Sequence, residues 1–367
     1  MTWLSPLSGD PLEADTPHSL ANGEERWPVV EGIPLLRTDR EGLVRTTLDH
    51  LDAGRTDEAL IGLLADQDDW WTGPTASADD LHELVSGRDD LTLREAMRLL
   101  AWGPVADYFA YRWSDPTYLA GLALMEAHWT APDTAFELAC GIGHYLRELT
   151  RRGVACLGGD IVFAKCWVAK NWVAPDAEYV VFDAASPWPI SNRHFDLAVC
   201  QDAFYFLPEK ERIADRLRAA ADTLLVGHLH NAGVTGGAMG PALEPSEWQT
   251  LFPQARVYDE DELLTALMEQ RAPKHAAFEN NSDIEAWSVA EGAGEPQRID
   301  AGLAMPAPGA NTRRNPLLNG GAEPHWPSER YREEYARRSY WAQPDEALPF
   351  PADPVRLRRE VDLPERW

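Results

Sequence analysis

Between residues 135 and 229, short apolar runs alternate with stretches of helical character, and this alternation constrains the fold more than any other feature of the chain. The expected strands cover residues 135–140, 154–158, 178–182, 195–200 and 223–229. The expected helices cover residues 143–152, 163–172 and 208–221. Strands and helices that alternate over short links are typical of a parallel sheet with helices on both faces. A helix over 259–269 and a hairpin of residues 275–278 and 284–289 are expected to complete the sheet.

A turn of small residues follows the first expected strand. It has the sequence Ala139-Cys140-Gly141-Ile142-Gly143, and a helix is expected directly after it. Glycine lets the backbone adopt left-handed conformations and approach a ligand closely, and the first turn of a helix presents free N–H groups. A tight turn without any ligand would use the same residues, so other positions have to decide between the two interpretations.

Carboxylates follow the next two expected strands. Asp160 ends the second strand. At this position a carboxylate can accept hydrogen bonds from both hydroxyl groups of a ribose, which could belong to a dinucleotide or to an adenosyl ligand. Leu146 stands where the nicotinamide-binding pattern has a third small residue, and its bulk is expected to hinder close helix packing. Asp183 follows the third strand, and its carboxylate can accept a hydrogen bond from the exocyclic amine of an adenine. These positions favour an adenosyl ligand and leave a nicotinamide-dependent oxidoreductase as the alternative.

Four segments in this order resemble the motifs of class I S-adenosylmethionine-dependent methyltransferases: residues 137–143, 159–160, 182–183 and 195–199. The resemblance covers residues 130 to 290. It implies an α/β fold with a Rossmann-like seven-stranded sheet, helices on both faces and an antiparallel last strand. The implied cofactor is S-adenosylmethionine, and the implied reaction is methyl transfer to a small-molecule oxygen, nitrogen or carbon nucleophile. A non-catalytic binding protein with the same fold is a further alternative.

The resemblance also implies which residues bind the methyl donor. They are Glu137, Ala139, Gly141, Gly143, Asp160, Ile161, Asp183, Ala184, Gln201 and Arg112. Glu137 would orient the first loop and the amino group of the donor, and Gln201 would flank its methionyl part. Arg112 could pair with the donor's carboxylate or be a solvated surface residue. Ala139 departs from the family, which usually has glycine there, so its methyl group leaves less room for the donor.

Two histidines at the end of the fifth expected strand are the strongest candidates for handling the acceptor. His228 and His230 are two residues apart, so in an extended strand both side chains point to the same face. They could act as a general base, orient the acceptor, or only cap the strand end. Tyr205 and His144 are expected to contact the substrate, with core packing and a helix-end contact as the respective alternatives.

The first 37 residues predict a small β module, and its segment 27–34 resembles the last strand of the zinc-ribbon-like module found in bacterial small-molecule methyltransferases. Ser5, Ser8, Leu20 and Gly23 occupy the positions of the metal-binding cysteines. None of these residues can replace a thiolate as a zinc ligand. We therefore expect a degenerate, metal-free ribbon, and we expect no metal-binding residues elsewhere in the chain.

Charge limits the partners of the chain. It has 33 Lys and Arg against 60 Asp and Glu, a formal net charge of −27, which repels phosphate backbones and anionic lipid headgroups. With no basic, apolar leader and no long apolar run, the sequence predicts a cytoplasmic protein with a small-molecule acceptor, and neither nucleic acid nor membrane as a partner. The expected domains are the module 1–37, a helical extension 38–130, the methyltransferase domain 131–290, and a Pro- and Gly-rich connection with a C-terminal extension, 291–367. The acceptor's identity and the oligomeric state stay open.

Overall fold

The structure, a computed structural model, describes residues 2–69, 71–235, 243–279, 283–300, 302–307, 309–318 and 323–367. The strands of its largest sheet are β6 (Thr134–Leu138), β7 (Ala155–Asp160), β8 (Glu178–Val181), β9 (Phe195–Gln201), β10 (Ala221–His230), β11 (Arg256–Asp259) and β12 (Ala286–Glu291). Their order is β11-β12-β10-β9-β6-β7-β8. The predicted Rossmann-like seven-stranded sheet is confirmed.

The chain packs as two compact units. The first consists of residues 1–106, 134–195 and 365–367, and the second of residues 107–133 and 196–364. The four-part division expected from the sequence stays a prediction.

The first unit begins with an antiparallel sheet of short strands, β1 (Trp3–Leu4), β2 (Pro11–Thr16), β3 (Ser19–Ala21), β4 (Arg26–Val30) and β5 (Ile33–Pro34). At its first turn, the hydroxyl of Ser5 donates to Glu25 and accepts the N–H groups of Leu7 (3.0 Å) and Ser8 (3.1 Å). Hydrogen bonds therefore hold this turn at a position where a ribbon would use a thiolate. The likeness of the module to a zinc ribbon stays a prediction.

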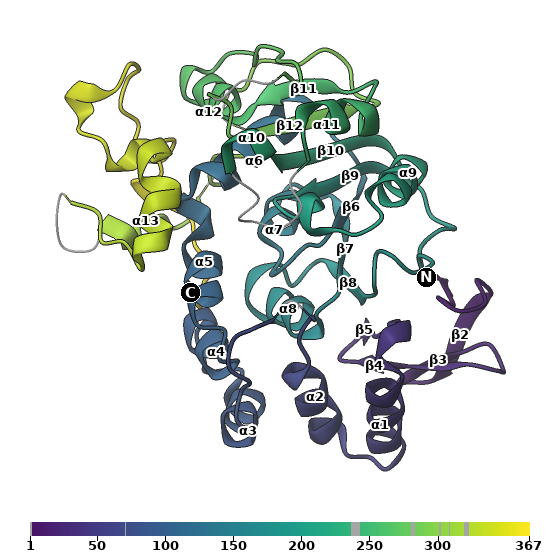
Figure 1. Cartoon of the computed structure of the whole chain (residues 1–367). Helices are drawn as coiled ribbons and strands as arrows, with labels where there is room; N and C mark the ends of the chain where they lie inside the picture. The colour runs from purple at the N-terminus through teal and green to yellow at the C-terminus, as the bar shows by residue number, and fades with distance from the viewer. Residues whose placement is uncertain are drawn as a thin grey trace. The chain divides into compact units, whose positions relative to one another are not determined.

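Helices follow the small sheet in the first unit: α1 (Glu41–Asp52), α2 (Thr56–Ala65), α3 (Ala78–Gly87) and α4 (Leu93–Leu99). The first two pack side by side, and the chain turns between them at Gly54 (Figure 1). Thr92 caps α4 in a capping box, because its hydroxyl accepts the N–H of Glu95 while the Glu95 carboxylate accepts the N–H of Thr92. The capping box fixes the start of this helix.

Strands β6, β7 and β8 of the first unit are parallel. Helices α7 (His144–Thr150) and α8 (Phe163–Val168) connect them, and α8 continues into a π-helical turn, Ala169–Val173. Leu146 of α7 fills the space above Gly158, where a Cβ would come within 2.6 Å of the leucine Cδ1. The glycine that lets helix and strand approach is thus on the strand, so the expectation that Leu146 hinders close packing is wrong.

The second unit begins at Asp107, inside helix α5 (Pro104–Tyr111). The helices that follow in this part of the unit are α6 (Pro116–Ala127), α9 (Lys210–Ala220), α10 (Ala232–Thr235), α11 (Pro245–Leu251) and α12 (Glu260–Glu269). Asp115 caps α6 by accepting the N–H of Tyr118 at 2.6 Å, and every residue of this helix is buried. Because α6 is buried on all sides, it lies inside the core of this unit.

The predicted hairpin at 275–289 is wrong. Strand β12 pairs antiparallel with β10 and with β11, so the expected antiparallel strand is present but its partners are different. Residues 275–278 contribute one isolated bridge, from Ala276 to Val257. The edge strand is instead β11, whose four residues are too few to show the alternation that identifies a strand in a sequence.

The C-terminal part of the second unit contains β13 (Arg313–Arg314), α13 (Glu329–Tyr335) and β14 (Glu360–Val361). Its buried side chains form an aromatic cluster, which consists of Leu317, Leu318, Tyr331, Tyr335 and Trp341 with Tyr108, Tyr111 and Trp326 packed against it. Tyr331 donates to the carbonyl of Tyr111 at 3.3 Å, and Trp341 donates to the carbonyl of Ser114 at 2.8 Å. The extension is therefore packed as part of the core.

Short 3-10 helices lie at Thr38–Arg40, Arg112–Ser114, Phe204–Phe206, Pro316–Leu318, Ala336–Arg338, Tyr340–Ala342 and Asp345–Ala347. All four cysteines are buried as free thiols. Within the described ranges, no helix combines the length and the apolar character needed to cross a membrane.

Candidate functional site

The predicted donor-binding turn lies in the first unit, between β6 and α7. Gly141 and Gly143 have φ angles of +53° and +79°, which glycine adopts without cost. A Cβ on Gly143 would also lie 3.2 Å from the hydroxyl of Tyr179. Ala139 has a φ of +56°, a left-handed conformation that costs an alanine about 1 kcal/mol. The family's preference for glycine at this position thus has a backbone reason in addition to the lack of room.

Asp160, at the carboxyl end of β7, is tied directly to this turn. One carboxylate oxygen accepts the N–H of Gly141 at 2.9 Å, and the other accepts the N–H of Val162 at 3.0 Å. The ammonium of Lys165 lies 3.8 Å from the carboxylate, which is buried. A carboxylate has about four acceptor positions, so these bonds fix its orientation and leave capacity for the two hydroxyls of a ribose.

The other predicted donor residues of the first unit lie near the ends of the same strands. Glu137 is buried in β6, beside Gly158 of β7. Asp183 follows β8, and its carboxylate accepts the N–H of Ala185 at 2.8 Å. Because the three strands are parallel and in register, their carboxyl ends form one edge, with a carboxylate on or just after each strand.

Three further predicted residues of the first unit surround this edge. The carbonyl of Ile161 accepts a hydrogen bond from Arg37 at 2.9 Å, and the carbonyl of Ala184 accepts one from Trp188 at 2.9 Å. His144 is the first residue of α7 and is buried, which excludes the alternative that it only contacts solvent at the helix end.

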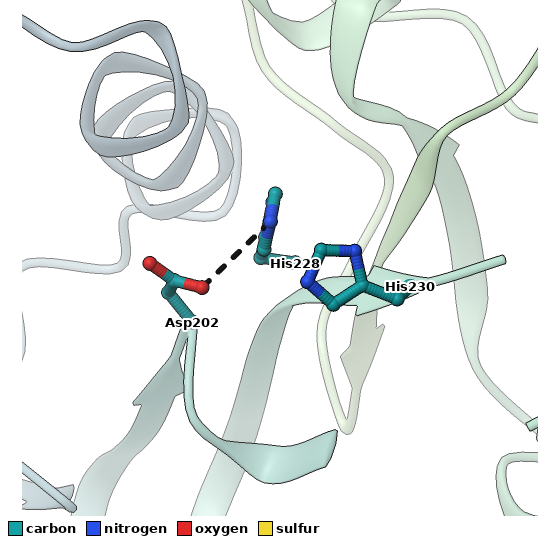
Figure 2. Close-up of side chains that lie close together, drawn as sticks. All are labelled: Asp202, His228 and His230. Carbon is teal, nitrogen blue, oxygen red and sulfur yellow. Dashed lines mark ion pairs between the residues drawn. The ribbon is translucent and has the colours of Figure 1, made fainter. Parts of the chain in front are cut away.

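The second unit brings together Asp202, His228 and His230, which we call the Asp–His–His cluster (Figure 2). One ligand atom from each residue lies within 4.8 Å of the others. Nε2 of His228 is 3.7 Å from the Asp202 carboxylate, and the centroids of the two imidazole rings are 4.4 Å apart. The side chains of His228 and His230 thus face each other at the end of β10.

Two residues of the cluster have left-handed backbone conformations. Asp202 has a φ of +53° and His228 a φ of +61°. The register between β10 and β12 also shifts between Val226 and Leu229, so His228 sits on an irregularity and not in the extended strand that the sequence predicted. Strained backbone of this kind is concentrated at functional sites.

The two histidines have opposite protonation tendencies. Burial alone lowers the pKa of His228, but the carboxylates of Glu260 and Asp202 outweigh it and raise that pKa to about 9. Burial, assisted by the neighbouring His228, lowers the pKa of His230 to about 4. At neutral pH the unliganded cluster therefore holds a charged His228 between two carboxylates and an uncharged His230.

Asp202 is held by three side chains of its own unit. Tyr108 donates to its carboxylate at 2.6 Å, Tyr205 donates at 3.0 Å, and Arg112 pairs with it at 3.0 Å. Arg112 is buried and also pairs with Asp115 at 3.2 Å, so it is not the solvated residue of the alternative interpretation. Its predicted role toward the donor's carboxylate stays a prediction. The ring of Tyr205 lies 4.4 Å from that of His230, which places Tyr205 at the cluster.

Gln201, the last residue of β9, lies over Gly227 of β10. A Cβ on Gly227 would come within 1.7 Å of the Gln201 side-chain oxygen, so only glycine leaves room for this side chain. The amide nitrogen of Gln201 is buried and has no hydrogen-bond partner among the described residues. A buried donor group of this kind is available to a ligand.

Residues 136–221 match the family model described as a methyltransferase domain. The match begins in β6, at the first donor motif, and ends at the start of β10. The chain therefore contains a methyltransferase domain. S-adenosylmethionine is its cofactor. Among curated protein sequences, none matches the chain.

Several solved structures resemble part of this methyltransferase. A TehB-like SAM-dependent methyltransferase from Corynebacterium glutamicum is 18% identical, with 47% of this chain and 85% of that chain covered and a TM-score of 0.35. A SAM-bound amino pentose methyltransferase from Micromonospora echinaspora is 18% identical, with 31% and 50% covered and a TM-score of 0.27. A phosphoethanolamine N-methyltransferase from Haemonchus contortus is 16% identical, with 43% and 45% covered and a TM-score of 0.35.

Sequence reasoning gave no role to two residues of the cluster region of this methyltransferase, Asp202 and Glu260. The Glu260 carboxylate accepts a hydrogen bond from Nδ1 of His228 at 2.8 Å, and both side chains are buried. In the sequence, Glu260 belongs to an acidic run at the start of a helix, which is the ordinary position for acidic residues near a helix N-terminus. No local signal distinguishes it from its acidic neighbours Asp261 and Glu262, which are only partly buried.

Proposed function

We propose that this methyltransferase transfers the methyl group of S-adenosylmethionine to an oxygen, nitrogen or carbon atom of a small molecule. The observation that carries the donor part of the proposal is the bond of Asp160 to the glycine turn. It couples the carboxylate assigned to the ribose with the backbone assigned to the methionyl part. Glu137, Asp183 and Ala184 complete the donor residues of the first unit, and the role of Gln201 toward the methionyl part stays a prediction.

When bound, S-adenosylmethionine would supply a methyl group on a positively charged sulfur, which would keep the electron pair of the carbon–sulfur bond when the acceptor's lone pair displaces it. Most of the rate in such a reaction can come from holding the two reactants in line and from excluding water. The residues of this chain therefore have to position both molecules and take up any proton that the acceptor loses.

We assign the acceptor to the Asp–His–His cluster and its neighbour Tyr205, and the role of His144 toward the substrate stays a prediction. In the unliganded cluster, the uncharged imidazole of His230 can receive a proton, whereas the charged His228 can donate a hydrogen bond to the acceptor. The small-molecule class rests on the net charge of −27, which opposes binding of a nucleic acid.

Binding of S-adenosylhomocysteine, the demethylated product of the donor, tests the proposal. We expect isothermal titration calorimetry to give one site in the wild-type protein, and an affinity weaker by about 1.5 to 3 kcal/mol in Asp160→Ala, because a charged acceptor of two hydroxyl groups is lost. Asp176→Ala is the matched control, since Asp176 is an exposed carboxylate of the same unit. Equal affinities in folded Asp160→Ala and wild type would reject the ribose role. Tighter binding of a nicotinamide dinucleotide than of S-adenosylhomocysteine would favour the oxidoreductase alternative.

A further inference from the structure

We propose that the Asp–His–His cluster binds a divalent transition-metal ion through the carboxylate of Asp202, Nε2 of His228 and one ring nitrogen of His230. One atom of each residue already lies within 4.8 Å of the other two (Figure 2). Ligand atoms about 2.1 Å from a common ion are about 3 to 3.5 Å apart. Small side-chain rotations would therefore close the cluster around an ion.

His230 gives the independent indication of a ligand. Its side chain is only 5% exposed, yet neither ring nitrogen has a hydrogen-bond partner among the residues that the structure describes. Burying a polar group without a partner is unfavourable, and native proteins rarely leave one in this state. The ring lies against Tyr205 and His228, so the rings of this cluster hold it in place. An ion bound at this point would satisfy one of its nitrogens.

His228 is oriented as metal-binding histidines are. Nδ1 bonds to the Glu260 carboxylate at 2.8 Å, while Nε2 faces Asp202. A carboxylate on the far nitrogen of a histidine fixes the tautomer and directs the other nitrogen at the metal. Glu260 is itself held by Arg338 of the C-terminal extension and by Ser288, each at 3.4 Å.

The third ligand is also supported from behind. Tyr108 and Arg112 contact one carboxylate oxygen of Asp202, and Tyr205 donates to the other, which is the oxygen closest to His228. Asp202 and His228 both keep left-handed backbone conformations to present these groups. The surrounding residues thus fix the carboxylate for a partner near His228.

The ligand set selects the class of metal. Two imidazole nitrogens and one carboxylate oxygen suit zinc, iron(II), cobalt(II) or nickel(II), whereas magnesium and calcium prefer oxygen ligands. Three protein ligands leave a position for water or for an acceptor atom, whose proton the ion would make easier to lose. This use of the ion rests on the proposed function, but binding of the ion does not. From the sequence we expected the chain to bind no metal, because the N-terminal module lacks cysteines at the metal-binding positions. The metal site proposed for the Asp–His–His cluster replaces this expectation.

Titration of chelator-treated protein with Zn²⁺ and with Co²⁺ tests the site. We expect one tightly bound ion per chain by calorimetry, and visible absorption bands of cobalt in a nitrogen and oxygen environment. His230→Ala and Asp202→Asn should each weaken Zn²⁺ binding at least 100-fold. His275→Ala is the matched control, because its imidazole belongs to the same unit but is 46% exposed and lies outside the cluster.

Circular dichroism of each variant shows whether it is folded. If His230→Ala does not fold, Glu260→Gln replaces it, with Zn²⁺ affinity expected to fall about 10- to 100-fold because the orientation of His228 is lost. Wild-type binding no tighter than that of these variants would overturn the inference. The calorimetric titration with S-adenosylhomocysteine, repeated in chelator, keeps the two proposals apart, because donor binding that persists without metal supports the donor site whatever the outcome for the cluster.

Discussion

Replacement of Gly227 by alanine gives a sharp test of the assignment of Gln201 to the donor. The new Cβ would lie 1.7 Å from the side-chain oxygen and 2.8 Å from the side-chain carbon of Gln201. No real contact is this short, so the amide group must leave its position over β10. The obstructing atoms belong to the end of a flexible side chain, and Gly227 has no positive φ, so the backbone can accept an alanine.

The expected effects on stability and on binding are therefore different. Where alanine can adopt the backbone conformation of a glycine, the replacement raises the free energy of unfolding by about 0.4 to 1 kcal/mol, because the unfolded chain has less conformational freedom to lose. This gain offsets part of the cost of moving Gln201. We expect the free energy of unfolding to change by no more than about 1 kcal/mol. Loss of one or two hydrogen bonds to the donor, at about 1 kcal/mol each, should raise the dissociation constant of S-adenosylhomocysteine about 5- to 30-fold.

Calorimetry gives the dissociation constant, and denaturant unfolding gives the stability. Gly62→Ala is the matched control, since a Cβ at this position in α2 has no neighbour within 4 Å. It should stabilise the protein by about 1 kcal/mol, as alanine does in a helix, and leave donor affinity unchanged. A folded Gly227→Ala protein with the affinity of the wild type would refute the reasoning that the displaced amide binds the donor.

Two further predictions concern stability. Ala139→Gly should raise the free energy of unfolding by about 0.5 to 1 kcal/mol, because it removes the left-handed strain at φ +56°, and a lower stability in urea unfolding would contradict this explanation. Burial, with Arg256 nearby, lowers the pKa of His128 to about 4. The pKa of His128 in the folded state is thus below the unfolded value near 6.5. The uncharged ring therefore contributes its full stabilisation to the folded state above pH 6.5, and this stabilisation is lost as the pH falls toward 4. Between pH 7 and pH 4, we expect the free energy of unfolding of His128→Gln to fall by about 3 kcal/mol less than that of the wild type. Equal falls in the two proteins would contradict the lowered pKa of His128.

The donor half of the site could be predicted from the sequence because its signals are local. The turn after β6 and the acids after β7 and β8 each belong to a short segment with a regular pattern. Parallel strands then bring these segments to one edge without further information. Leu146 misled the prediction because the compensating residue, Gly158, lies on another element.

The acceptor half could be predicted only in part. His228 and His230 stand out at the end of a strand, but the left-handed conformation in the irregularity of β10 falls on His228 and not on the neighbouring Gly227, so the sequence does not indicate it. Glu260 and Arg338 reach the cluster from distant parts of the chain, and neither lies in a motif. Their roles depend on long-range packing, which a single sequence does not show.

A crystal structure of the protein soaked with S-adenosylhomocysteine would show whether the carboxylates at the strand ends bind the methyl donor. We expect the ribose hydroxyls within hydrogen-bond distance of the Asp160 carboxylate, the adenine beside Asp183 and Ala184, and the glycine turn against the homocysteine part. A ligand bound elsewhere, with Asp160 in contact only with Gly141, Val162 and Lys165, would rule out this donor site.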